Sequence, residues 1–163
     1  MSFVEIDIQD QIMIVKLNRP ERLNALGKGI REGMADAFNQ FKNDKNLEVS
    51  ILTGEGRGFC AGEDMKESVE AGSIVDTPGK SPDLDDPFIN GTLDKPVIGA
   101  INGYAMGGGF MLVERTDLRV AVKEALFEMS EAKRWLVGGY NHGHYANIPH
   151  PISKEEASGF RLS

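Results

Sequence analysis

The chain has 163 residues, and its 40% hydrophobic and 26% charged content is typical of a globular protein with one compact hydrophobic core. With 18 basic and 25 acidic residues the formal charge is −7, which argues against nucleic acid or an anionic membrane as the main partner. A single cysteine, no apolar run of the ~20 residues needed to cross a bilayer, and no signal peptide at the start together predict a cytoplasmic protein with no membrane partner.

The first half of the chain predicts a β-hairpin, a helix and a buried strand. Residues 4–8 alternate apolar and acidic side chains, and residues 12–17 form an apolar-rich run, which together indicate a pair of short strands. Residues 29–44 carry apolar side chains at helical spacing and are expected to form an amphipathic helix. Residues 49–53 follow as a short buried strand, and the glycine-rich loop 54–58 ends it.

The second half alternates short apolar strands with glycine turns and a helix. We expect strands at residues 97–102, 118–121 and 125–127, and a helix that begins at about Phe110. Residues 68–90 are polar, rich in Pro, Gly, Ser and Asp, and without periodicity, so we expect a mobile surface loop. Buried strands that alternate with helices predict an α/β fold with largely parallel pairing, in which ligands bind at the carboxyl ends of the strands.

The tail of the chain has a different character. Residues 138–163 show no helical or strand period, and the chain stops where a helix could begin, as an interrupted protein would. The histidines of this tail have no neighbouring cysteine and fit no standard ligand spacing, so we expect no metal site. They are His142, His144 and His150.

Three consecutive glycines, Gly107, Gly108 and Gly109, follow one predicted strand and precede the predicted helix. Glycine lets a ligand approach the main chain closely, and the first N–H groups of a helix have no acceptor within it. This arrangement suits an oxyanion hole, and a tight turn where the helix crosses another backbone is the simpler alternative. The glycine order does not match a dinucleotide-binding fingerprint, and the loop at 54–58 lacks the lysine and hydroxyl residues of a P-loop.

A second segment, residues 59–66, reads FCAGEDMK and carries small side chains at its centre. Small residues would allow its amides to face a ligand, and Lys66 would be placed to meet a phosphate. Taken alone, the segment is also an ordinary loop that leads into a helix. Cys60 is predicted to be a small buried residue rather than a nucleophile, because no histidine or lysine neighbours it in the sequence.

Five stretches occur in order between residues 4 and 137, namely LNRPERLNAL, ILTGEGRGFCAGEDMKE, KPVIGAINGYAMGGG, DLRVA and ALFEMSEAKRWL. In this order and approximate spacing they resemble the enoyl-CoA hydratase/isomerase (crotonase) family. The resemblance implies a crotonase-like (ClpP/crotonase) α/β spiral of ββα units, which assembles into homotrimers or hexamers. It also implies that residues 1–163 form the N-terminal spiral domain, and that the helices that build the trimer lie beyond this chain.

The resemblance assigns roles to both glycine-containing segments. The thioester oxygen of an acyl-CoA substrate would accept hydrogen bonds from the amides of Glu63 and Gly108, which bind the enolate more tightly than the ground state. Coenzyme A enters as part of this substrate, so no separate cofactor is expected. The expected substrate-binding residues are Arg22, Leu23, Ala25, Ala61, Gly62, Asp64, Met65, Lys66 and Met111.

The carboxylates distinguish this chain from a hydratase that uses two glutamates. Hydratases of the family place a water molecule with two glutamates, and here Met111 occupies the first position and Glu131 the second. Methionine can neither take a proton nor orient water as a base. Glu114, one helical turn after Met111, is an alternative carboxylate, although a solvated or salt-bridged helix residue is the simpler reading.

Two hypotheses about function follow from this pattern. In the first, Glu131 is the acid/base of an enoyl-CoA hydratase/isomerase, since a single carboxylate that moves a proton between carbons is sufficient for double-bond isomerisation. Glu131 also reads as an ordinary surface residue near a helix start. In the second, the chain is a catalytically weak or inactive truncated crotonase-like module that binds acyl-CoA or a protein.

Overall fold

The computed structural model describes residues 3–70 and 84–129, which all belong to one compact unit, Met1–Met129. None of the helices in these two ranges is both long and apolar enough to cross a membrane. The strands are β1 (Val4–Gln9), β2 (Ile12–Leu17), β3 (Val49–Gly54), β4 (Gly58–Cys60), β5 (Val97–Ile101), β6 (Tyr104–Met106), β7 (Leu118–Ala121) and β8 (Phe127–Glu128). The helices are the 3₁₀ turn η1 (Pro20–Arg22), α1 (Lys28–Asn43), α2 (Met65–Glu70), α3 (Pro87–Asn90) and α4 (Gly108–Arg115).

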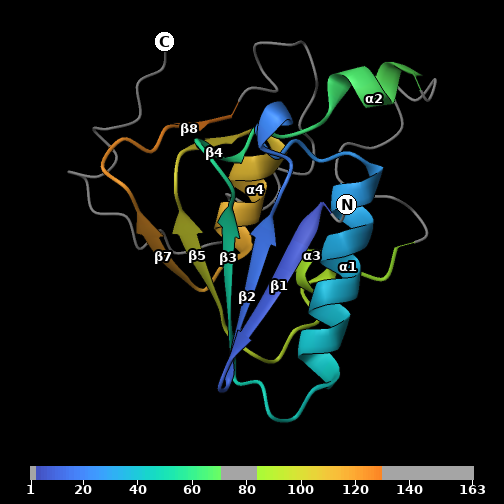
Figure 1. The fold of residues 1–163 in the computed structure, drawn as a ribbon, viewed down its shortest axis with the longest axis vertical. Helices are drawn as coiled ribbons and strands as arrows, with labels where there is room; N and C mark the ends of the chain where they lie inside the picture. Colours follow the sequence, from blue (N-terminus) through green and yellow to red (C-terminus); the bar gives the residue numbers. More distant parts are fainter. Residues whose placement is uncertain (1–2, 71–83, 130–163) are drawn as a thin grey trace. The chain divides into compact units, whose positions relative to one another are not determined.

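The strands form two sheets, and from β3 onward the chain alternates between them (Figure 1). The larger sheet has the order β1-β2-β3-β5-β7, and the smaller one has the order β4-β6-β8. The hairpin β1–β2 is antiparallel, and every other pairing within the two sheets is parallel. Two strands and then a helix recur along the chain as β1-β2-α1, β3-β4-α2 and β5-β6-α4, so the predicted α/β architecture with largely parallel pairing is confirmed.

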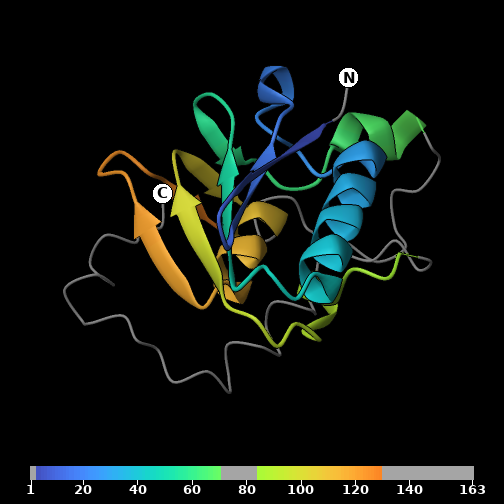
Figure 2. The same cartoon turned by 60° about the horizontal axis from the view of Figure 1, so that its bottom comes forward.

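Apolar alternation places the core between the larger sheet and the helices. Met13, Val15 and Leu17 of β2 are fully buried, whereas the residues between them are only half-buried. Helix α1 turns its apolar stripe to the same core, as its spacing of three and four residues predicts. Helices α1 and α4 cover the same face of the larger sheet (Figure 2). The buried residues of α1 are Ile30, Met34, Ala35, Ala37, Phe38 and Phe41.

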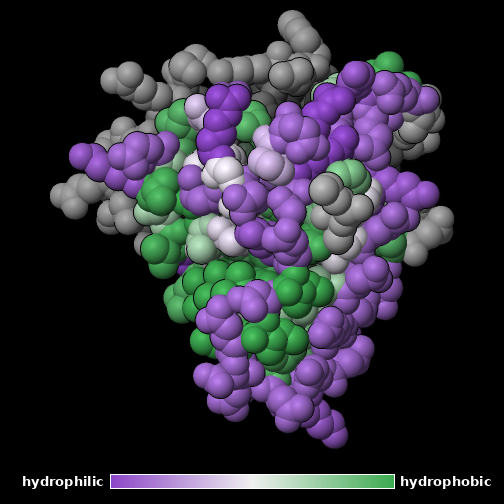
Figure 3. All heavy atoms as spheres, viewed as in Figure 1, coloured by the Kyte–Doolittle hydropathy of each residue, from purple (hydrophilic) through white to green (hydrophobic). Residues whose placement is uncertain are grey.

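The opposite face of the larger sheet carries an apolar surface. Figure 3 shows apolar side chains gathered over the strands on the face turned to the viewer. Ile51 and Ile98 are half-buried there and alternate with buried neighbours along their strands. On β7, which lies at the edge of the sheet, Leu118 and Val120 are 63% and 66% exposed.

Two predictions about the elements need correction. The expected loop at 68–90 is helical at both of its described ends, because α2 continues to Glu70 and α3 begins at Pro87. Helix α3 forms because the Asp86 carboxylate caps it, and because Phe88 stacks on Phe38 with ring centroids 4.6 Å apart. The helix expected from Phe110 begins two residues earlier. Strands β4 and β6 are additions to the prediction, since three-residue strands give no period to detect.

Candidate active site

Two loops lie side by side at the carboxyl ends of β4 and β6. These strands pair in parallel, so the residues that follow them leave the smaller sheet at the same end, where the strands have their carboxyl ends. A β-carbon added to Gly62 would lie 2.6 Å from the Met106 carbonyl oxygen and 3.2 Å from the Gly108 nitrogen. A β-carbon added to Gly108 would lie 3.9 Å from the Glu63 nitrogen. The two glycine segments predicted to act together are therefore neighbours, with no side chain between their main chains.

The amides of Glu63 and Gly108 are the donors of interest at this edge. Gly108 is the first residue of α4, so its N–H group lies in the first turn, where amides have no intrahelical acceptor. Apart from bonds inside helices and strands, no hydrogen bond of the described residues uses either amide as donor. Gly107, the N-cap of α4, has a φ of 52°, a conformation that favours glycine. The arrangement offers two main-chain donors at the end of a helix.

The segment that follows η1 holds the Glu63 loop in place. The Leu26 amide donates to the Gly62 carbonyl oxygen at 2.7 Å, and the Ala61 amide donates to the Leu23 carbonyl oxygen at 3.0 Å. Leu26 and Glu63 also form an isolated parallel bridge. The Glu63 loop thus pairs with the segment around Leu26 as two short parallel strands would. This pairing fixes the direction of the amides in the loop.

Seven of the nine predicted substrate-binding residues fall into three groups. Leu23 and Ala25 lie in the paired segment just described, next to Ala61 and Gly62, so these four are brought together. Arg22 is exposed at the end of η1. Half-buried Met65 and exposed Lys66 form the first turn of α2, which starts from the Glu63 loop.

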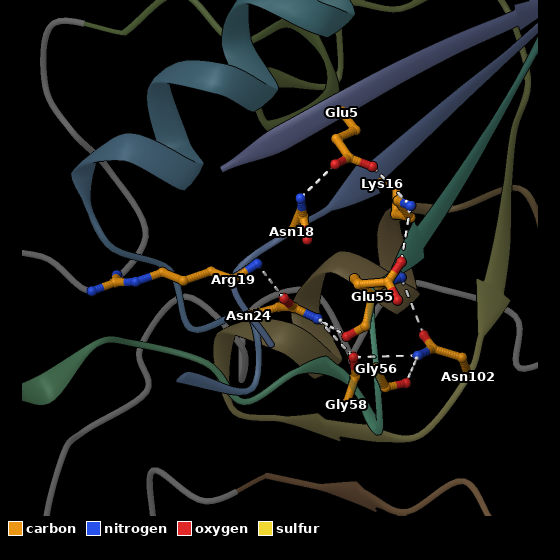
Figure 4. A network of polar contacts seen from close by, with 10 residues as sticks. Glu5, Lys16, Asn18, Arg19, Asn24, Glu55, Gly56, Gly58 and Asn102 are labelled. Carbon is orange, nitrogen blue, oxygen red and sulfur yellow. Dashed lines mark hydrogen bonds and ion pairs between the residues drawn. The ribbon is translucent and has the colours of Figure 1, made fainter. Parts of the chain in front are cut away.

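A buried asparagine, Asn24, holds the main chain of the loop between β3 and β4. The sequence alone did not indicate this role. Its side chain is fully buried and donates to the carbonyl oxygens of Glu55 at 3.0 Å and Gly58 at 2.8 Å, while it accepts from the Arg19 amide at 2.8 Å. Asn102 binds the main chain of the same loop (Figure 4). The stretch LNRPERLNAL contained Asn24, but the two carbonyl oxygens that its side chain binds lie more than thirty residues away and leave no local signal.

The side chains of Glu63 and Asp64 turn toward arginines rather than into open space. The Arg31 guanidinium forms an ion pair with the Glu63 carboxylate, which also accepts from the Ser68 hydroxyl at 2.9 Å. Arg19 lies 2.9 Å from the Asp64 carboxylate, whose side chain is only 4% exposed. Because Asp64 also caps the first amides of α2, a ligand contact at this residue would have to use its main chain.

The described carboxylates near the glycine turn give no obvious catalytic pair. Met111 is 6% exposed and belongs to the hydrophobic core cluster. Glu114 is half-buried and already takes part in an interaction. Glu131, the predicted acid/base, lies outside the described residues, as do His142 and the rest of the tail. No group of three potential metal ligands occurs within residues 3–70 and 84–129.

Cys60 behaves as a buried small residue, as its sequence context predicts. Its side chain is fully buried in the core next to Phe59. Burial raises the pKa of its thiol from 9.0 to about 12, so the thiol stays protonated near neutral pH. A protonated, inaccessible thiol is not a nucleophile.

A family model described as enoyl-CoA hydratase/isomerase matches residues 7–158. The chain belongs to the enoyl-CoA hydratase/isomerase family. It is 35% identical to 1,2-epoxyphenylacetyl-CoA isomerase of Escherichia coli K12 over 84% of this chain and 54% of the relative. It is 41% identical to carnitinyl-CoA dehydratase of Salmonella heidelberg over 77% of this chain and 48% of the relative.

Solved structures place the chain in the same enoyl-CoA hydratase/isomerase family. The crystal structure of enoyl-CoA hydratase from Mycobacterium tuberculosis H37Rv superposes with a TM-score of 0.75 at 36% identity, over 97% of this chain and 62% of that chain. The crotonase-like fold, a spiral of ββα units, is therefore confirmed. The chain spans about half the length of the curated relatives it matches.

Proposed function

We propose that the chain binds an acyl-CoA thioester and stabilises its enolate with the main-chain amides of Glu63 and Gly108. The observation that carries this proposal is the contact between the two glycine segments, which leaves two donors at one edge with no side chain between them. Preorganised amides act where negative charge develops, and the loss of one such donor costs ~3 kcal/mol. The names of the relatives support the substrate class, since an isomerase and a dehydratase in this family both act on CoA thioesters.

We further propose that Glu131 is the acid/base and that the reaction is of the hydratase/isomerase class. Met111 contributes no carboxylate, and its burial in the core argues against a water-ordering role at that position. One carboxylate is sufficient to move a proton from one carbon of the acyl chain to another. Isomerisation therefore needs fewer groups from this chain than hydration does.

The rest of the substrate is proposed to lie along the segment after η1 and the start of α2. Arg22 and Lys66 are both exposed and carry positive charge suited to the CoA phosphates. Leu23 and Ala25 border the thioester end through their pairing with the Glu63 loop.

A homotrimer or hexamer is the assembly proposed for the protein, and sedimentation velocity would measure it.

Two steady-state assays test the proposed activity. Crotonyl-CoA hydration and 3-enoyl-CoA isomerisation are measured for the natural sequence and for Glu131→Gln. The proposal expects turnover in at least one assay and its loss in Glu131→Gln, because glutamine keeps the size of the side chain but cannot take up a proton. Glu124→Gln, on an exposed residue of the same acidic type, is the matched control and should leave the rate unchanged. Full activity in Glu131→Gln would show that the acid/base is another residue.

A second function is favoured by the apolar environment of Met111. A crotonase-like module without a competent carboxylate pair would bind acyl-CoA, or a protein partner, without turnover. Calorimetry with a saturated acyl-CoA separates the two proposals. Binding of that ligand together with no rate in either assay would favour the module, whereas a rate in either assay would favour the enzyme.

A further inference from the structure

The side chain of Glu63 is held by two different helices. Its Oε2 atom is paired with Nη2 of Arg31, which lies in the second turn of α1. Its Oε1 atom accepts a hydrogen bond from the Ser68 hydroxyl of α2 at 2.9 Å. Arg31 is 16% exposed and Glu63 is 33% exposed, so solvent screens this pair less than it would screen a surface pair. Both carboxylate oxygens thus have partners.

This carboxylate belongs to the residue whose amide is the proposed oxyanion donor. A carboxylate free to swing toward that amide would compete for the donor or repel the developing negative charge of an enolate. The ion pair directs the side chain to α1 and compensates its charge. The main chain of the same residue is held independently through the bridge to Leu26, so the side-chain contact is not needed to form the loop.

We propose that Arg31 is a positioning residue for the oxyanion site, because it holds and neutralises the Glu63 carboxylate and so keeps the Glu63 amide available to a thioester oxygen. The inference rests on the proposed function, and it adds a residue on α1 that touches neither the substrate nor the reacting atoms. Arg19 stands in a similar relation to Asp64. Asp64 also caps α2, however, so its substitution would not separate charge from helix stability.

The test uses a bound chromophore that reports polarisation of the thioester. The absorption of 4-dimethylaminocinnamoyl-CoA moves to longer wavelength when donors polarise its carbonyl, and the shift is read per bound molecule. The variants are Arg31→Met, Arg31→Lys and the double variant Arg31→Met with Glu63→Gln, in the full chain. Lys28→Met is the matched control, because Lys28 forms an exposed pair with Glu32 on the same helix. Thermal unfolding of each variant confirms that it is folded.

Arg31→Met is expected to reduce the shift and to weaken probe binding about tenfold, as coupled neighbours do. The double variant is expected to recover most of this loss, since no carboxylate is left to compensate, and Arg31→Lys should lie close to the natural sequence. Lys28→Met should leave both readouts unchanged. A loss in the double variant as large as in Arg31→Met, or in Arg31→Lys as large as in Arg31→Met, would overturn the inference. An unchanged shift in Arg31→Met would overturn it as well.

Failure of the proposed function gives a different result in the same experiment. If the natural sequence binds the probe without any shift to longer wavelength, or does not bind it, the oxyanion site is wrong and the role of Arg31 is wrong with it. If the natural sequence shows the shift and Arg31→Met keeps it, only the role of Arg31 is wrong.

Discussion

At the scale of single residues, the approach of the Gly62 and Gly108 main chains depends on the lack of a β-carbon at Gly62, where one would lie 2.6 Å from the Met106 carbonyl oxygen. Gly108 begins helix α4, and the only tight contact of an added β-carbon would be with the end of the flexible Leu26 side chain, at 2.9 Å; Gly62 and Glu63 would lie at ordinary contact distance. We therefore expect Gly108→Ala to fold but to lose acyl-CoA affinity, because the new methyl group occupies space in front of the two amides. Calorimetry with a saturated acyl-CoA, together with thermal unfolding, measures both effects. Unchanged affinity in a folded Gly108→Ala protein would count against the amide site.

Gly62→Ala, unlike Gly108→Ala, is expected to lower the stability of the fold. Gly62 has a φ of 86°, and a β-carbon there would lie 2.6 Å from the Met106 carbonyl oxygen, a main-chain atom that cannot move alone. The strained conformation alone costs about 1–3 kcal/mol, so the free energy of unfolding should fall by at least that amount. Urea unfolding of Gly62→Ala beside Gly108→Ala tests this order of stabilities. Equal stability of the two variants would contradict the described backbone.

The buried thiol of Cys60 predicts a pH dependence. Its pKa is raised by burial from 9.0 to about 12, so the folded state holds the proton more tightly than the unfolded state. This contribution to stability is present in full below about pH 9 and is lost as the pH rises toward 12. Iodoacetamide should accordingly modify the native protein slowly at about pH 9 and the urea-unfolded protein rapidly. Equal rates of modification in the two states would show that Cys60 is accessible.

Some of these residues were predictable, and others were not. The burial of Cys60 and the pairing of the two glycine segments follow from local sequence and from an ordered resemblance. The contacts of Asn24 with Glu55 and of Glu63 with Arg31 do not, because these partners lie about thirty residues away along the chain. The cap that the Asp64 carboxylate forms on α2 was not expected from the sequence, and substrate binding at Asp64 stays a prediction.

At the scale of elements, the stability of helix α2 depends on the cap that Asp64 provides at its N-terminus. The Asp64 carboxylate accepts from the amides of Lys66 at 3.2 Å and Glu67 at 3.1 Å. Asp64→Ala should lower the free energy of unfolding by about 1–2 kcal/mol, whereas Asp64→Asn, which still caps, should lose less. Chemical denaturation of both variants measures the difference. An equal loss in the two variants would mean that the ion pair with Arg19, which both variants remove, contributes more than the cap.

The elements that sequence periodicity predicted are the ones with enough length to show a period. The hairpin β1–β2, helix α1 and strand β3 were all expected within a few residues of their ends. Strands β4 and β6 have three residues each, and their parallel partners come from other turns of the spiral. Helix α3 exists through its cap and the stacking of Phe88 on Phe38, which are tertiary contacts that the polar sequence around it conceals.

At the scale of the whole molecule, the spiral explains why residues from separate motifs meet. The first turn places both of its strands, β1 and β2, in the larger sheet. From β3 onward each pair of strands adds one strand to the larger sheet and one to the smaller sheet, so the loops after β4 and β6 lie at the same end of the smaller sheet. No internal repeat is visible in the sequence, because the turns share only strand and helix positions and not residue types. The fold class was thus predictable from alternating patterns, whereas the two-sheet geometry became predictable only through the family resemblance.

We propose above all that the amides of Glu63 and Gly108 hold a thioester oxygen. A crystal structure of the protein with a bound acyl-CoA tests it most directly. We expect the thioester oxygen to lie about 2.7–3.2 Å from both main-chain nitrogens, the usual range for an N–H donor and an oxygen acceptor. A thioester oxygen beyond hydrogen-bond reach of the Gly108 nitrogen, in a complex whose CoA moiety is well ordered, would contradict it.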